Sequence, residues 1–160
     1  MKLQTPRFGE IDVDQAQIIS FPSGVIGFPQ VRQYVLLEDD KNAPFQWLQA
    51  VEDANLRFLV INPFLFRKDY EFEIPDPILE QIGAEKPEDV AVLAIVTIQP
   101  DTHRLTANLQ GPVVVAGNTR IAKQLVLVST PYHTRHDILE EMGVKMEAEP
   151  VSAGAAIEKP

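Results

Sequence analysis

The sequence has 160 residues, no cysteine, and 14 basic against 23 acidic side chains, which gives a formal net charge of -9. This length suits one domain with a substantial core. The lack of cysteine excludes disulfides and thiolate chemistry. The negative charge argues against direct binding of nucleic acid. No apolar run approaches the roughly 20 residues of a membrane helix, and the start lacks a secretory signal, so we expect a cytoplasmic protein without membrane contact.

Short apolar segments, rich in Val, Ile and Phe and separated by turn residues, predict a protein built mainly of β-strands. In chain order, strands are expected at residues 9–13, 18–21, 34–38, 46–51, 56–61, 70–73, 90–98, 104–110, 113–116 and 122–128. The strand at 90–98 is almost continuously apolar, which is typical of a strand covered on both faces. The strand at 104–110 alternates apolar and polar residues, so we expect it to be half-buried.

Helix signals are fewer. Residues 77–82 predict one internal helix, because Asp76 can cap its free amides and Gly83 can end it. A second short helix is expected after Asp137. These elements favour an all-β, mainly antiparallel domain, folded as a small closed or partly open β-barrel with one or two short helices.

The domain is expected to span residues 1–142. From residue 143 to residue 160 the sequence is small and polar, which predicts a flexible C-terminal tail. No internal repeat and no second domain are indicated.

An alternation of acidic and apolar side chains runs through residues 69–74. In a strand, Asp69, Glu71 and Glu73 would share one face, opposite three apolar side chains. The apolar face can close a core, while the anionic face can bind a cationic partner. The same pattern also protects a sheet edge in solvent, and the sequence leaves both interpretations open.

Two further groups are candidates for partner contacts. Glu38, Asp39 and Asp40 form a second acidic cluster at a predicted turn. Phe45 and Trp47 share one face of a predicted strand. Large aromatic side chains dominate both cores and interfaces, so Trp47 is expected in the core and would contact a partner only if exposed.

Catalytic and metal-binding patterns are not indicated. His133 and His136 lie three residues apart, but with only His103 besides, a zinc site would need distant carboxylates, so we expect surface histidines. The glycine-containing segment 21–28 lacks the Lys-Ser/Thr pair of a phosphate loop, and no nucleophile elbow is present. We therefore expect no enzyme, no metal and no cofactor.

Several motifs occur in a characteristic order. They are Thr5-Pro6-Arg7-Phe8-Gly9, Phe21-Pro22, Pro44-Phe45, Trp47-Leu48-Gln49, Pro63-Phe64, Asp69-Tyr70-Glu71-Phe72, the run 93–98 and the run 106–112. From about residue 2 to 142, they resemble the flagellar assembly factor family, FliW. The resemblance implies a small, barrel-like, non-enzymatic protein that binds the carbon storage regulator CsrA, a small basic dimeric repressor of translation.

The resemblance further implies a partner switch. Binding of CsrA would relieve repression of flagellin mRNA, and flagellin would compete for the assembly factor, which we expect to be a monomer when free. We assign Asp69, Glu71 and Glu73 to CsrA binding, with the 38–40 cluster as a second contribution, and the two aromatic residues to flagellin if they are exposed. The alternative is a carrier that holds a small molecule inside the barrel.

Overall fold

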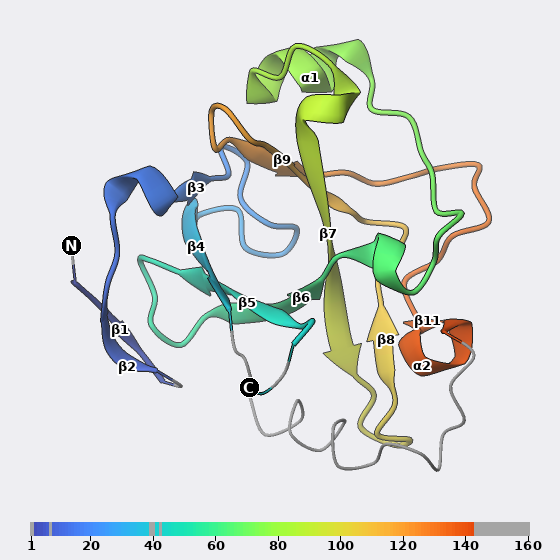
Figure 1. Ribbon diagram of the computed structural model, residues 1–160, viewed down its shortest axis with the longest axis horizontal. Coiled ribbons are helices and arrows are strands. Elements are labelled where there is room, and N and C mark those ends of the chain that lie inside the picture. The colour runs from blue at the N-terminus through green and yellow to red at the C-terminus, as the bar shows by residue number, and fades with distance from the viewer. Residues whose placement is uncertain (1, 7, 39–40, 42, 143–160) are drawn as a thin grey trace.

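The strands of the protein form a small N-terminal hairpin and one large, mostly antiparallel sheet that curls into a half-barrel (Figure 1). The computed structural model describes residues 2–6, 8–38, 41 and 43–142. Its strands are β1 (Lys2–Thr5), β2 (Gly9–Asp12), β3 (Ile19–Ser20), β4 (Gln33–Glu38), β5 (Gln46–Ala50), β6 (Arg57–Ile61), β7 (Val90–Ile98), β8 (Leu105–Ala107), β9 (Val113–Ala116), β10 (Ala122–Gln124) and β11 (His136–Asp137). The expected barrel-like, mainly antiparallel fold is confirmed.

The large sheet runs in the order β10-β9-β7-β6-β5-β4-β3, and β8 and β11 extend it beside β7. Its two ends meet at an isolated parallel bridge between Ser20 and Ile121. The Ser20 N–H donates to the Arg120 carbonyl at 2.8 Å. Past this bridge no ladder joins β3 to β10 among the described residues, so the barrel is partly open.

Both faces of the sheet are covered. Leu93 of β7 packs in a cluster with side chains from β3, β4, β9 and β10, which lies inside the curl. Its neighbour Ala94 packs in a second cluster on the outer face. That face is covered by helix α1 (Asp76–Ile82), by helix α2 (Ile138–Glu141) and by the segments that precede them. Burial on both faces explains the nearly continuous apolar sequence of β7.

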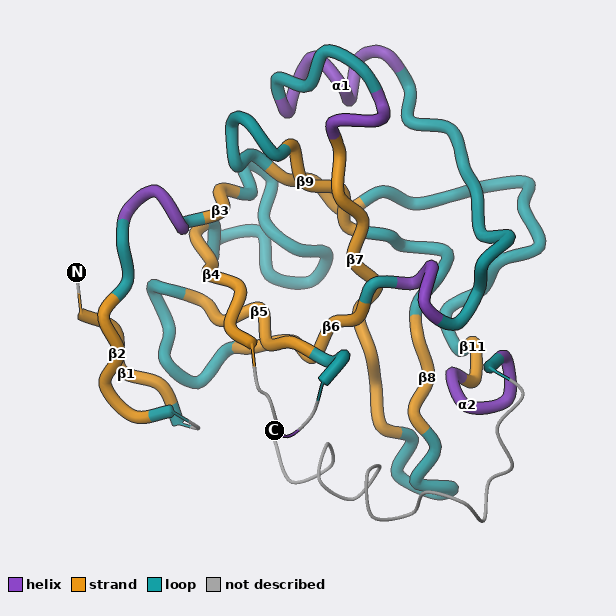
Figure 2. The backbone as a smooth tube through the Cα atoms, viewed as in Figure 1, coloured by secondary structure: helices purple, strands orange, loops and turns teal. Residues whose placement is uncertain are grey.

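Two long loops run along the outer face of the sheet, one between β6 and α1 and one between β10 and β11 (Figure 2). The first contains the short 3-10 helix η3 (Pro63–Leu65). The other 3-10 helices are η1 (Gln15–Gln17) and η4 (Pro87–Asp89). These loops, rather than strands, carry the side chains that matter below.

Several strand predictions need correction. Residues 70–73 form no strand, since within the described ranges no other segment pairs with their main chain. The hairpin strand β1 was not expected, since only Leu3 and Thr5 alternate inward and so short a pattern carries little signal. Strand β8 ends at Ala107, because the Asn108 side chain accepts hydrogen bonds from the Gln110 and Gly111 N–H groups and turns the chain.

Helix α1 begins one residue earlier than expected. Asp76 is its first residue, Pro75 occupies the cap position without a side-chain hydrogen bond, and the predicted Asp76 cap is wrong. Gly83 ends the helix at a φ of 74°, as expected. The Asp137 side chain accepts from the Glu140 N–H at 2.9 Å and starts α2. Within the described ranges, no helix has the length and apolar character needed to cross a membrane.

Candidate protein-binding surface

The acidic segment between η3 and α1 keeps the predicted alternation although it is not a strand. Tyr70 is buried, and Phe72 and Ile74 pack against the outer-face cluster. Glu71 and Glu73 are exposed. Alternation therefore predicted correctly which side chains face the core, whereas the predicted strand pairing was wrong.

Tyr70 fixes the start of this segment. Its hydroxyl donates to the Leu109 carbonyl at 2.7 Å, and its ring packs edge-on against Tyr132 at 4.7 Å between centroids. Burial raises the pKa of Tyr70, and the nearby Tyr132 adds to this effect. The Tyr132 hydroxyl in turn accepts from the Glu71 N–H at 3.1 Å. The segment is thus held in place from two distant parts of the chain.

Arg67 neutralises one of the three predicted acids. Its guanidinium bonds Asp69 at 2.7 Å and Glu141 at 2.9 Å, and it lies over the Tyr132 ring. The hydrogen bonds that Arg67 donates to Glu141 and, next in size of effect, to Asp69 raise the pKa of Arg67. Glu71 and Glu73 differ, because in the described part of the chain neither forms an ion pair.

His136 lies beside this network and corrects a prediction. It was expected at the surface, but it is 5% exposed, whereas His133 is exposed and stacks on it at 3.9 Å between ring centroids. His136 Nε2 accepts from the His133 N–H, so in the neutral ring Nδ1 carries the proton donated to Glu141 at 2.5 Å. Burial lowers the pKa of His136 despite the opposing effect of Glu141.

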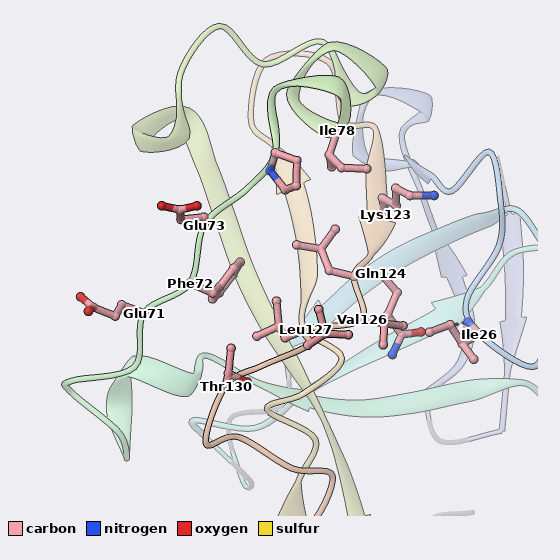
Figure 3. A pocket seen from close by; sticks show the side chains of 13 residues that line it. Ile26, Glu71, Phe72, Glu73, Ile78, Lys123, Gln124, Val126, Leu127 and Thr130 are labelled. Carbon is pink, nitrogen blue, oxygen red and sulfur yellow. Dashed lines mark hydrogen bonds between the residues drawn. The ribbon is translucent and has the colours of Figure 1, made fainter.

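A groove of about 1030 Å³ separates the acidic segment from the chain that follows β10 (Figure 3). The Phe72 side chain points into the groove. Glu71 and Glu73 lie on one side of the groove, and their carboxylates point outward. Ile26 and Lys123 lie on the opposite side. The lining is mainly apolar with charges at the margins, which is the arrangement found in many protein-binding surfaces.

The other predicted contact residues lie elsewhere. Glu38 is exposed at the end of β4, while Asp39 and Asp40 lie outside the described residues. Phe45 is half-buried and packs against the outer-face cluster. Trp47 is 4% exposed, so it does not meet the condition for a partner contact; it belongs to the core. None of the described members of this group lines the groove.

Sequence reasoning missed the exposed valines of the groove. Val126 is 63% exposed and Val128 is 75% exposed, although both were placed in a strand. Residues 125–128 are all apolar, so their pattern has no polar member to mark an outward face. Strand geometry could have predicted the exposure: if a strand is covered on one face only, every second side chain points to solvent, even in a fully apolar run.

Comparison with known proteins gives a consistent result. A model of the FliW protein family matches residues 2–138. A flagellar assembly factor FliW from Alkaliphilus metalliredigens is 45% identical over 157 residues, which cover 98% of this chain and 97% of that protein. One from Treponema denticola is 44% identical over 142 residues, covering 89% and 96%.

A solved structure gives the same match at the level of the fold. The crystal structure of the flagellar assembly factor FliW matches with a TM-score of 0.80 at 36% sequence identity. The match covers 86% of this chain and 96% of that one.

Proposed function

Because the chain belongs to the FliW family of flagellar assembly factors, we propose that it binds the translational repressor CsrA and relieves repression of flagellin mRNA. Flagellin is the competing partner, so accumulated flagellin releases CsrA again. This partner switch matches flagellin synthesis to demand. It operates in the cytoplasm, where translation takes place, and the protein enters it as a monomer.

One observation carries the assignment of the CsrA-binding surface. Glu71 and Glu73 project from the same side of a well-anchored segment, are exposed, and form no ion pair in the described part of the chain. Two free carboxylates on a fixed backbone suit a basic protein partner, because complementary charge speeds association and selects the partner. Asp69 contributes less, since Arg67 already neutralises it.

The same surface disfavours the alternatives. Arg67, Tyr70 and His136 have shifted pKa values, but each is engaged in bonds that hold the outer face together, and none lines the groove. Shifted groups that lie outside the groove and are bonded to neighbouring residues support a structural role rather than acid–base catalysis. A carrier would need space inside the curl, where the described residues instead form a packed apolar cluster.

Titration calorimetry with purified CsrA tests the proposal. We expect tight binding by the wild-type protein and loss of binding by the double variant Glu71→Lys, Glu73→Lys. The matched control is Glu85→Lys, Asp101→Lys, which makes the same charge change at exposed residues outside the groove. Circular dichroism establishes that both variants remain folded. Absence of CsrA binding by the wild-type protein would refute the proposal, and an unchanged affinity of the folded groove variant would place the site elsewhere.

A second titration tests the switch. CsrA is added to protein already saturated with flagellin, and we expect the heat of CsrA binding to disappear. Because Trp47 is buried, its fluorescence should not change when flagellin binds, so flagellin contacts other groups. A large shift of the Trp47 emission would instead mean that flagellin opens this part of the core.

A further inference from the structure

The ladder between β9 and β10 continues beyond the last residue of β10. Gln124 pairs with Val113, and in the same register the Leu125 N–H donates to the Pro112 carbonyl at 2.8 Å. Two residues later the Leu127 N–H donates to the Gln110 carbonyl at 2.8 Å. The first bond is one-sided because proline has no N–H to donate in return. The second is one-sided because the Gln110 N–H donates to the His133 carbonyl and to the Asn108 side chain instead. The chain from Ala122 to Leu127 is therefore one continuous edge of the sheet.

Along the groove, no strand among the described residues pairs with the outward side of this edge, and the one contact there is the Ile26 N–H, which donates to the Gln124 side chain at 2.9 Å. In an antiparallel ladder, successive residues direct their N–H and C=O groups to opposite sides, so Val126 and Val128 direct theirs away from β9. Among the described residues, no hydrogen bond reaches the backbone of Val126 or Val128. Earlier on this side, the Arg120 carbonyl accepts from Ser20 of β3, which shows that the edge can take a neighbouring strand.

The side chains beside this open edge form an apolar surface. Val126 and Val128 line the groove together with Ile26, which is also exposed. An edge that is unpaired, apolar and exposed invites addition of a strand from another chain, because main-chain bonds and alternate side chains are then both satisfied.

Charges at the margins restrict what can bind. Glu71 and Glu73 lie on one side of the groove and Lys123 on the other (Figure 3). No ion pair of Lys123 is present in the part of the chain that the structure describes. A segment that fits this groove would therefore carry a Lys or Arg near the two carboxylates and apolar residues in its middle.

We infer that the open edge from Gln124 to Val128 binds a partner by β-strand addition, and that the added strand is an extended, apolar segment with a basic residue directed at Glu71 and Glu73. The inference rests on the proposed function, since it takes the basic repressor of that proposal as the source of the strand. It adds the mode of binding: main-chain pairing on the edge gives affinity, and the two carboxylates set the direction and the choice of partner.

Amide hydrogen exchange, followed residue by residue by NMR, tests the pairing directly. In the free protein, the N–H groups of Leu125 and Leu127 should be protected and those of Val126 and Val128 should exchange freely. In the complex with purified CsrA, we expect Val126 and Val128 to gain protection of about tenfold or more, the equivalent of one hydrogen bond each. This alternating gain is a pattern that simple covering of the groove would not produce.

Two substitutions at Val126 separate the contribution of the main chain to binding from that of the side chain. Val126→Pro removes the outward N–H and fixes φ at a value that edge strands tolerate. Val126→Ala trims the side chain but keeps that donor. We expect Val126→Pro to weaken CsrA binding by about tenfold relative to Val126→Ala. If Val126→Pro does not fold, the exchange experiment on the wild-type protein decides the question alone.

The possible outcomes distinguish the inferred mode of binding from the proposed function. A complex that is sensitive to Glu71→Lys, Glu73→Lys but leaves Val126 and Val128 unprotected would overturn strand addition and leave the proposed function standing. Absence of any complex with CsrA would overturn both. Protection of Val126 and Val128 together with the affinity difference between the Pro and Ala variants would establish strand addition.

Discussion

Strand β5 and residues 70–73 of the acidic segment were both predicted to be strands, but only β5 pairs with its neighbours. Strand β5 pairs with β4 on one side and β6 on the other, and its side chains Trp47 and Leu48 fill the clusters on the two faces. The acidic segment pairs with no strand, and only one of its faces is covered. The comparison teaches that alternation decides which side chains turn inward, whereas pairing depends on which segments the fold brings alongside.

The same difference separates stability from recognition. The paired region buries its side chains and satisfies its main chain, so it holds the fold and offers little to a partner. The acidic segment and the edge beside it leave carboxylates, valines and main-chain groups accessible. Substitutions in the two regions should therefore have opposite consequences, large for stability in the first and large for binding in the second.

The largest effect is expected in β5. Leu48→Ala removes a fully buried side chain and should lower the free energy of unfolding by about 2 to 5 kcal/mol. Phe72→Ala, in the half-buried acidic segment, should cost clearly less, because part of that ring is already in contact with water. Urea denaturation of both variants measures the difference. Equal losses would mean that the acidic segment is as much a part of the core as β5.

A smaller effect is expected from the anchor of the acidic segment. Tyr70→Phe deletes the buried bond to the Leu109 carbonyl and should cost about 1 to 3 kcal/mol. Tyr34→Phe is the matched control, because the buried Tyr34 hydroxyl has no hydrogen-bond partner among the described residues. Removing it should be neutral or stabilising. A Tyr34→Phe loss as large as that of Tyr70→Phe would contradict this account of the two hydroxyls.

Burial raises the pKa of Tyr34 to about 12, and the charge of Glu52 adds to this effect. A phenol without a partner in such surroundings should not ionise at ordinary pH. Absorbance at the phenolate band during alkaline titration provides an independent check on Tyr34→Phe.

His136 should give a milder, pH-dependent effect. Its pKa is lowered in the folded protein from an ordinary value of 6.5, so the neutral ring is the stable form there. The contribution to stability is therefore fully present above pH 6.5 and falls as the pH drops from there toward the lowered value, because the unfolded chain takes up the proton first. Thermal unfolding between pH 5 and 8 follows this change.

Two variants separate His136 from its neighbour. His136→Gln should flatten the pH dependence in this window, while His133→Gln should retain it because His133 is exposed. The prediction fails if both variants keep the wild-type dependence, or if stability rises as the pH is lowered through the window.

The smallest effect is expected at the two free carboxylates. Glu71→Gln with Glu73→Gln should leave the free energy of unfolding within about 0.5 kcal/mol of the wild-type value, because exposed side chains without partners contribute little. Thermal unfolding measures this directly. A substantial loss of stability would show that the two carboxylates stabilise the folded protein and are not free to bind a partner.

Local sequence determined much of the architecture. The apolar run at β7, the glycine that ends α1 and the aspartate that starts α2 are each visible within a few consecutive residues, so each could be predicted from the chain alone. The alternation through the acidic segment likewise predicted that Glu71 and Glu73 would be exposed. The order of short motifs predicted the family, which the comparisons show.

Tertiary structure decided the rest, wherever an outcome depended on residues far apart in the chain. His136 is buried where β11 pairs with β8, with the His133 ring stacked on it and Glu141 bonded to it. Residues 70–73 do not pair as a strand because grooves separate them from β10 on one side and from the start of β7 on the other. The edge after β10 stays open because β3 reaches only as far as Ile121. Pairing and burial are properties of segments that meet only in the folded chain, and local patterns carry no record of which segments will meet.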